Sequence, residues 1–176
     1  MKLSLFALAG LALASAGTLA VAQIERLDLP TMVTRTDDAV YGAIVAKEVA
    51  KVVSEEPDGP TLYFTKITVD GYSLKSGQPT VVDMWYGGGF VSETEGVHNS
   101  EAPSADDTKV GNKVVAFHKY EYNMGNGLSG NALYAWHGGL YRTFENRAGE
   151  AIVLGRGEGY AIGSNVKLSD LDSQIQ

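Results

Sequence analysis

One histidine and three glutamates lie close together in an acidic stretch of the chain: Glu93, Glu95, His98 and Glu101. Imidazole nitrogens and carboxylate oxygens bind divalent metals, and a site made of carboxylates suits Ca²⁺. The stretch has neither the i, i+4 spacing of a helical zinc motif nor the D-x-D-x-D-G order of a calcium loop. We therefore predict no cofactor, with a transition metal at His98 or Ca²⁺ on the carboxylates as the cations that the loop could bind. A solvated, mobile loop is the alternative, because like charges repel one another.

Aromatic residues border the glycine-rich turns. Those nearest to the turns, together with one histidine, are Trp85, Tyr86, Phe90, Trp136 and His137. Aromatic rings at the rim of a barrel stack on sugars or grip peptides, so we predict that these residues form a rim at which a ligand or partner binds. Packing is the alternative use, because a small barrel fills its interior with large side chains.

Sequence signals for catalysis are absent or incomplete, and no catalytic residue is predicted. The chain has no G-x-S-x-G motif, and Ser164 to Lys167 fits S-x-x-K without the companion motifs of that enzyme class. The glycines of 155–159 do not match the G-x-G-x-x-G order of a dinucleotide-binding loop. An acid pair for glycoside cleavage stays open, because 21 acidic residues make many pairs.

Composition limits the partners. Asp and Glu outnumber Lys and Arg by 21 to 14, which gives a formal net charge of −7. Such an acidic chain lacks the positive surface that binds nucleic acid or an anionic membrane. Cysteine is absent, which excludes thiol catalysis and thiolate metal sites. No run of roughly 18 apolar residues follows the first segment, so no membrane span is predicted.

Residues 1–22 have the layout of a secretory leader. Lys2 gives a positive start, residues 3–13 are mostly apolar, and Ala20-Val21-Ala22 offers small side chains before a cleavage point at Gln23. We expect a signal peptide over 1–22 and a single exported domain over 23–176, which is periplasmic or secreted.

Short alternating segments separated by glycine-rich turns predict an all-β domain. The expected strands cover 61–75, 80–86, 113–122, 132–137, 140–144 and 151–154. Segment 39–53 fits either a strand or a helix, and the two interpretations stay open. Gly138 and Gly139 predict a hairpin between 132–137 and 140–144, and a change of apolar phase at Gly71 predicts a β-bulge.

These elements predict a small, closed fold. Consecutive hairpins favour antiparallel pairing, and closure of the sheet removes exposed strand edges. We predict an antiparallel β-barrel of five to seven strands, with short helices at 29–36 and from near Ser169. A long acidic loop is expected over about 90–111.

Four motifs, in this order, resemble those of exported bacterial proteins of unknown role. They are Asp38–Val45, Tyr63–Gly77, Trp85–Gly89 and Gly111–Phe117, and the similarity spans residues 29–144. The same order is similar to that of tissue inhibitors of metalloproteinases and netrin-like modules. This resemblance implies a β-barrel of the oligonucleotide/oligosaccharide-binding (OB) type. Those inhibitors chelate the protease zinc through an N-terminal cysteine, which this chain lacks.

The hypothesis that follows is a non-enzymatic binding or interaction module at the cell envelope, with a protein or saccharide partner. A protease inhibitor of the same barrel type that acts without an N-terminal cysteine is one alternative. A hydrolase with an unrecognised acid pair or Ser/His site is the other.

Overall fold

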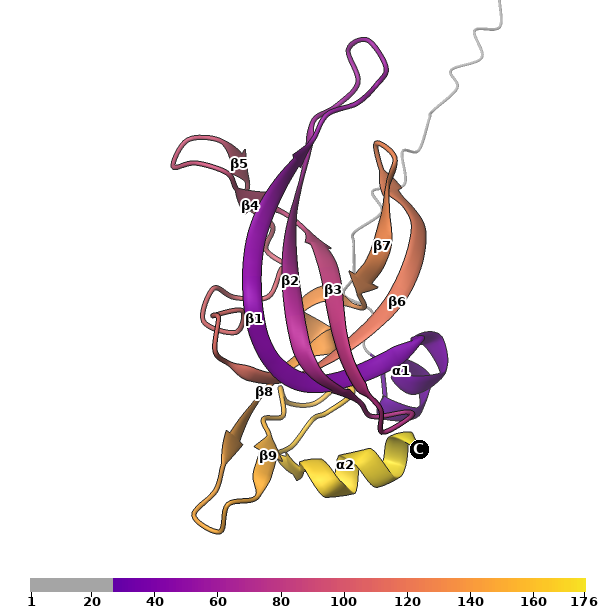
Figure 1. Ribbon diagram of the computed structural model, residues 1–176, viewed down its shortest axis with the longest axis vertical. Helices are drawn as coiled ribbons and strands as arrows, with labels where there is room; N and C mark the ends of the chain where they lie inside the picture. Colours follow the sequence, from indigo (N-terminus) through magenta and orange to yellow (C-terminus); the bar gives the residue numbers. More distant parts are fainter. Residues whose placement is uncertain (1–26) are drawn as a thin grey trace, which may run out of the picture.

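The computed structural model describes residues 27–176, so the leader predicted over 1–22 lies outside the described residues. The described part is mostly β-structure, as predicted, with one short helix near each end (Figure 1). The helices are α1 (Leu29–Arg35) and α2 (Leu168–Ile175), with a 3₁₀ turn η1 (Trp136–Gly139). The strands are β1 (Asp38–Val52), β2 (Leu62–Ser73), β3 (Pro79–Gly87), β4 (Gly89–Phe90), β5 (Gly96–Val97), β6 (Lys113–Gly125), β7 (Leu128–Leu133), β8 (Leu140–Glu145), β9 (Ala151–Val153) and β10 (Val166–Lys167).

Eight of these strands form one sheet that partly closes on itself. Its order is β1-β2-β3-β7-β6-β8-β9-β10, and β1 also pairs with β6. The pairings therefore link β1, β2, β3, β7 and β6 into a ring. The β3–β7 contact is a short parallel one, limited to Met84 with Asn131 and Trp85 with Ala132. The sheet has eight strands rather than the predicted five to seven, because β8, β9 and β10 continue it beyond the ring.

The ambiguous segment 39–53 is a strand. β1 pairs with β2 along its length and with β6 over its first half, so both of its edges are occupied there. A register shift in β1 lies between Ile44 and Ala46. The bulge predicted at Gly71 is wrong, since Gly71 pairs in regular register with Gly42 and Thr80. The apolar phase changes there because Tyr72 and Leu74 pack against a second core.

Two hydrophobic cores lie on opposite faces of the sheet. The first is inside the ring and includes Val40, Ile44, Ile67, Val69, Met84, Tyr86, Val114, Ala116, Leu133 and Leu140. The second includes Leu74, Val115, Phe117 and Tyr141, and both helices cover it (Figure 1). Successive residues in the first half of β6 alternate between the two cores, which is why this half is buried on both faces.

The hairpin predicted between 132–137 and 140–144 is wrong. β7 pairs with the second half of β6, while β8 pairs with its first half, so both run along one edge of the same strand. The turn η1 separates them without folding one against the other. Gly139 is required at this turn, because a Cβ there would lie 1.9 Å from the carbonyl oxygen of Tyr134. The glycine pair therefore marks a close approach of two backbone segments.

Candidate functional site

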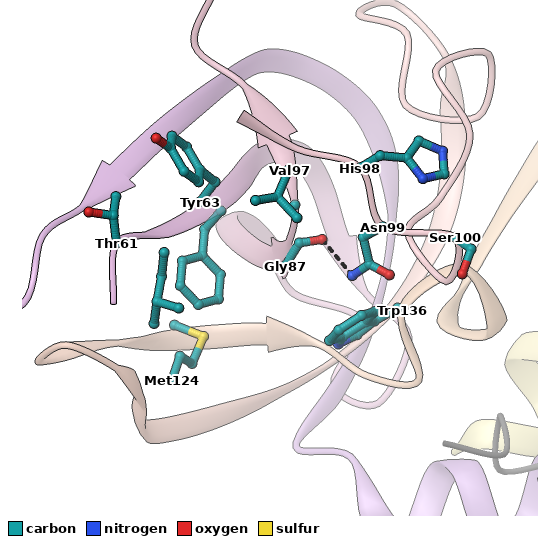
Figure 2. A pocket seen from close by; sticks show the side chains of 12 residues that line it. Thr61, Tyr63, Gly87, Val97, His98, Asn99, Ser100, Met124 and Trp136 are labelled. Atoms are coloured by element: carbon teal, nitrogen blue, oxygen red, sulfur yellow. Dashed lines mark hydrogen bonds between the residues drawn. The ribbon is translucent and has the colours of Figure 1, made fainter. Parts of the chain in front are cut away.

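A pocket of about 480 Å³ lies near the ends of β2, β3 and β6 that point away from the helices (Figure 2). Twelve residues line it: Thr61, Leu62, Tyr63, Phe64, Gly87, Gly88, Val97, His98, Asn99, Ser100, Met124 and Trp136. Three of them are aromatic, three are aliphatic or thioether side chains, and none is Lys, Arg, Asp or Glu. Its volume is in the range of pockets that hold small molecules.

The β6–β7 hairpin is fixed over the start of β2. Asn126, at the turn of this hairpin, donates from Nδ2 to the carbonyl oxygens of Pro60 at 2.7 Å and Val52 at 3.0 Å. Both carbonyls belong to the base of the β1–β2 hairpin. These bonds tie together two hairpins that are far apart in sequence, and Met124 thereby lines the same pocket as Leu62 and Phe64.

The second wall is the start of the acidic loop, whose first part is the β4–β5 arm (residues 89–97). The Nζ of Lys51 lies 2.5 Å from Oε1 of Glu95, and the Tyr63 hydroxyl donates to the same oxygen at 3.1 Å. The hydrogen bond from Lys51, followed by that from Tyr63, holds the pKa of Glu95 below its ordinary value. The loop therefore contains a short paired arm that is attached to β1 and β2.

Asn99 positions the remainder of this wall. Its Nδ2 donates to the carbonyl oxygen of Gly87 at 3.0 Å, and its Oδ1 accepts a hydrogen bond from the backbone N–H of Glu101 at 3.0 Å (Figure 2). The side chain thus joins the loop to the end of β3. Because both ends of the amide are used, Asn99 shapes the pocket rather than leaving its oxygen open to a ligand.

Trp136 forms the base of the pocket on a strained turn. Ala135 and Trp136 both have left-handed backbone conformations, with φ of 50° and 46°. Non-glycine residues adopt this conformation at a cost, and such strain persists where surrounding contacts enforce it. Backbone strain of this kind often occurs at functional sites, so the turn makes the neighbouring pocket a candidate site.

His137 holds that turn in place. It donates from its backbone N–H at 3.2 Å and from Nδ1 at 2.8 Å to the carbonyl oxygen of Glu101. Since a carbonyl only accepts, Nδ1 carries the proton, and Nε2 of the neutral ring accepts from the Tyr160 hydroxyl at 3.1 Å. The backbone next to Trp136 is therefore held by bonds of His137 to two other loops, at Glu101 and Tyr160.

The residues predicted to form a rim have different positions. Trp136 lines the pocket, whereas His137 is bonded to the carbonyl oxygen of Glu101 and is not a lining residue. Tyr86 is buried inside the ring, and Trp85 lies under the ammonium of Lys66, 5.4 Å from the centroid of its ring. Phe90 is 52% exposed on the β4–β5 arm. The structure thus brings one of the predicted aromatic side chains, Trp136, to the pocket wall.

The acidic candidates for a metal site are also separated. Glu93 is exposed, Glu95 is paired with Lys51, and Glu101 contributes its backbone to the contacts of Asn99 and His137. His98 lines the pocket. Within residues 27–176, no three His, Asp and Glu side chains are placed so that they could hold a metal ion.

Several lining residues have no signal in the sequence. Leu62 and Phe64 lie at the start of β2, and Met124 lies near the end of β6, so neither pattern distinguishes them from ordinary structural positions. They become a site only when the β6–β7 hairpin lies over β2. The bonds of Asn126 to Val52 and Pro60, which connect residues more than 60 positions apart, could not be inferred from alternation of apolar residues.

Ser100 and His98 are the pair in the pocket that could suggest a hydrolase. A serine nucleophile needs a base within hydrogen-bonding distance, oriented by a third group. Their side chains point in different directions, and no hydrogen bond joins them in the described part of the chain (Figure 2). Among the residues that line the pocket, no serine and histidine are thus paired as nucleophile and base.

Comparison with protein-family models, with curated proteins and with solved structures found no match to this chain. None of the helices within residues 27–176 has the length and apolar character needed to cross a membrane.

Proposed function

We propose that this protein is an exported, non-enzymatic binding module whose ligand site is the pocket at Trp136. We also propose that the ring of β1, β2, β3, β7 and β6 is a small barrel of the OB type. The strand order, the parallel β3–β7 contact and the β1–β6 pairing support that assignment. In such barrels the loops beside the second and third strands commonly bind ligands.

The observation that carries the proposal is the preformed base of the pocket. Ala135 and Trp136 are in a strained backbone conformation, and the His137 contacts keep them there. A turn that only joined β7 to β8 would gain nothing from this strain. A site that must present an indole in one orientation benefits, because binding then costs less ordering of the protein.

The chemistry of the lining favours a ligand without net charge. Among its twelve residues there is no Lys, Arg, Asp or Glu to pair with a charged group. Removal of an ionic group from water without a partner is costly, so a neutral ligand with an apolar face fits this pocket best.

Binding of the neutral fluorophore N-phenyl-1-naphthylamine tests the proposal. Its fluorescence should rise in the presence of the protein, because the dye becomes bright in apolar surroundings. Ser100→Trp should fill the pocket and weaken dye binding by about tenfold. Ser100 is exposed and has no hydrogen bond from its side chain in the described structure, so the fold should tolerate the change.

Gln78→Trp is the matched control. Gln78 is exposed in the turn between β2 and β3, at the opposite end of the sheet (Figure 1). It adds the same indole without touching the pocket and should leave dye binding unchanged. Equal binding by the wild type and both variants would show that the dye binds elsewhere and would reject the pocket as the ligand site.

A further inference from the structure

We propose that the pocket binds a neutral pyranose unit of a saccharide, which stacks on Trp136. This inference rests on the proposed function and names its ligand class. A pyranose ring has an apolar C–H face and a periphery of hydroxyl groups. It therefore needs a flat apolar surface next to donors and acceptors that are free to bond.

The first requirement is an uncovered aromatic surface. Trp136 lines the pocket and is half-buried, because part of its indole packs against the core inside the ring of strands. A Cβ placed on Gly87 would lie 3.4 Å from Cη2 of Trp136, so a side chain at Gly87 would contact the indole where it borders the pocket. The backbone at Ala135 and Trp136 fixes the ring. Indoles present an apolar face of large area with little loss of conformational freedom on binding.

The second requirement is a set of unused polar groups. Asn99 and Tyr63 are already bonded, to Gly87 with Glu101 and to Glu95, respectively. By contrast, the side chains of Thr61, His98 and Ser100 make no hydrogen bond within residues 27–176 and are exposed. They offer two hydroxyls and an imidazole, each of which can donate to and accept from sugar hydroxyls.

The distribution of these groups matches the two sides of a sugar. Figure 2 shows His98, Asn99 and Ser100 along one wall, with Met124 on the opposite side and Trp136 at the base. A fully apolar ligand would leave the free hydroxyls and the imidazole unpaired. An acidic sugar would bring a carboxylate to a pocket without a lining cation, in a protein of net charge −7. A neutral sugar can place its hydroxyl groups against the polar wall and its C–H face against the apolar side chains.

The two tryptophans of the chain allow a direct test. In Trp85→Phe the remaining indole is Trp136, whose emission then reports the pocket. The variant is titrated with the neutral tetrasaccharides of cellulose, starch, xylan, mannan and chitin, and with the tetrasaccharide of polygalacturonic acid as the acidic probe. At least one neutral probe should shift the emission of Trp136, and the acidic probe should bind at least about tenfold more weakly.

Two further variants separate binding from folding. Trp136→Phe, which retains Trp85, should show no emission change with the same probe and a weaker affinity by calorimetry. Ser100→Ala alters one exposed hydroxyl and should weaken binding several-fold with an unchanged unfolding midpoint. Unchanged affinity in both variants would overturn the assignment of the saccharide to this pocket.

The outcomes also distinguish the two proposals. If N-phenyl-1-naphthylamine binds at the pocket but none of the neutral saccharides does, the saccharide assignment is wrong and the binding module stands. If the acidic probe binds as tightly as the neutral ones, the argument from the uncharged lining is wrong. If neither the dye nor any saccharide binds, both proposals fail.

Discussion

The carboxylate of Glu95 accepts hydrogen bonds from Lys51 at 2.5 Å and from Tyr63 at 3.1 Å, and so connects the β4–β5 arm to two strands of the ring. The arm precedes His98 and Ser100, which form one wall of the pocket. The position of that wall therefore depends on the ionised state of one exposed side chain.

Glu95→Gln should reduce stability in a manner that depends on pH. The hydrogen bonds from Lys51 and Tyr63 lower the pKa of Glu95 in the folded protein. The contribution of the ionised Glu95 to the free energy of unfolding is thus complete above the ordinary carboxyl pKa. It is lost as the pH falls through the lower pKa of the folded state. The difference in melting temperature between wild type and variant should be largest near pH 7 and should vanish in strong acid, at about pH 2. Glu93→Gln, at an exposed position of the same arm, should show no such difference.

The variant His118→Phe should lose less stability in mild acid than the wild type. His118 is 7% exposed, and within residues 27–176 neither ring nitrogen has a hydrogen-bond partner. Burial lowers the pKa of this imidazole below 6.5, although Asp38 and Asp37 oppose the shift. Below the ordinary pKa the unfolded chain takes up a proton that the folded chain refuses, so stability falls as the pH drops towards the folded-state value.

Urea unfolding at about pH 7.5 and about pH 5.5 measures this effect. The free energy of unfolding of the wild type should fall from about pH 7.5 to about pH 5.5, and that of His118→Phe should fall less. The variant should also be more stable than the wild type by about 1 kcal/mol, because an unpaired buried polar group is replaced. His98→Gln, which changes an exposed histidine, should keep the wild-type dependence. The same slope in all three proteins would contradict the role assigned to His118.

Gly139→Ala and Gly138→Ala should differ strongly although the residues are adjacent. A Cβ at Gly139 would lie 1.9 Å from the carbonyl oxygen of Tyr134, whereas one at Gly138 would lie 3.5 Å from the Cβ of Ala135, an ordinary contact. We expect Gly139→Ala to destabilise the fold by about 3 kcal/mol or more, and Gly138→Ala to stay within about 1 kcal/mol of wild type. Chemical denaturation of the two variants gives the comparison, and similar losses in both would refute the close approach at η1.

Asp107→Asn should loosen the end of the acidic loop. Its carboxylate lies 3.3 Å from Nε of Arg142 and 3.0 Å from a terminal guanidinium nitrogen of Arg156, and its side chain is 17% exposed. Loss of the charge should cost about 1 kcal/mol, since the two guanidinium groups then lack their shared partner. Asp106→Asn is the control, because Asp106 is exposed and makes no ion pair in the described residues. Equal unfolding midpoints for the two variants would count against this contact.

Export can be checked on the full chain. We propose cleavage after Ala22, so intact mass measurement of the protein recovered from a bacterial periplasm or medium should give a chain that begins at Gln23. Substitution of Ala22 by Arg should block cleavage and retain the longer mass. Recovery of the uncleaved wild-type chain from the cytoplasm would reject the proposed leader.

Local patterns predicted the strands but not their partners. The segment Lys113 to Tyr122 predicted β6, and its apolar run is continuous because each face of the strand meets a different core. The glycine pair at 138–139 was interpreted as a hairpin, since nothing in the sequence shows that Tyr134 approaches Gly139. The acidic loop lacked periodicity because its two strands are only two residues long.

The pocket was harder to predict from local sequence patterns than the strands were. Trp136 was identified because it is an aromatic residue beside a turn, whereas Met124 and Phe64 carry no comparable signal. Their contribution depends on the contact between the β1–β2 and β6–β7 hairpins through Asn126. Contacts of this kind follow from the curvature of the sheet, which apolar alternation does not encode.

β6 has neighbours on both edges at Val114, Val115 and Ala116, which pair with β1 on one side and β8 on the other. Their amide protons should exchange with deuterium only when the whole domain unfolds, whereas those of the two-residue strands β4 and β5 should exchange through local opening. The centre of the sheet and the arm beside the pocket would then move on separate timescales. Opening of the arm would then leave the pairings of the ring of strands intact.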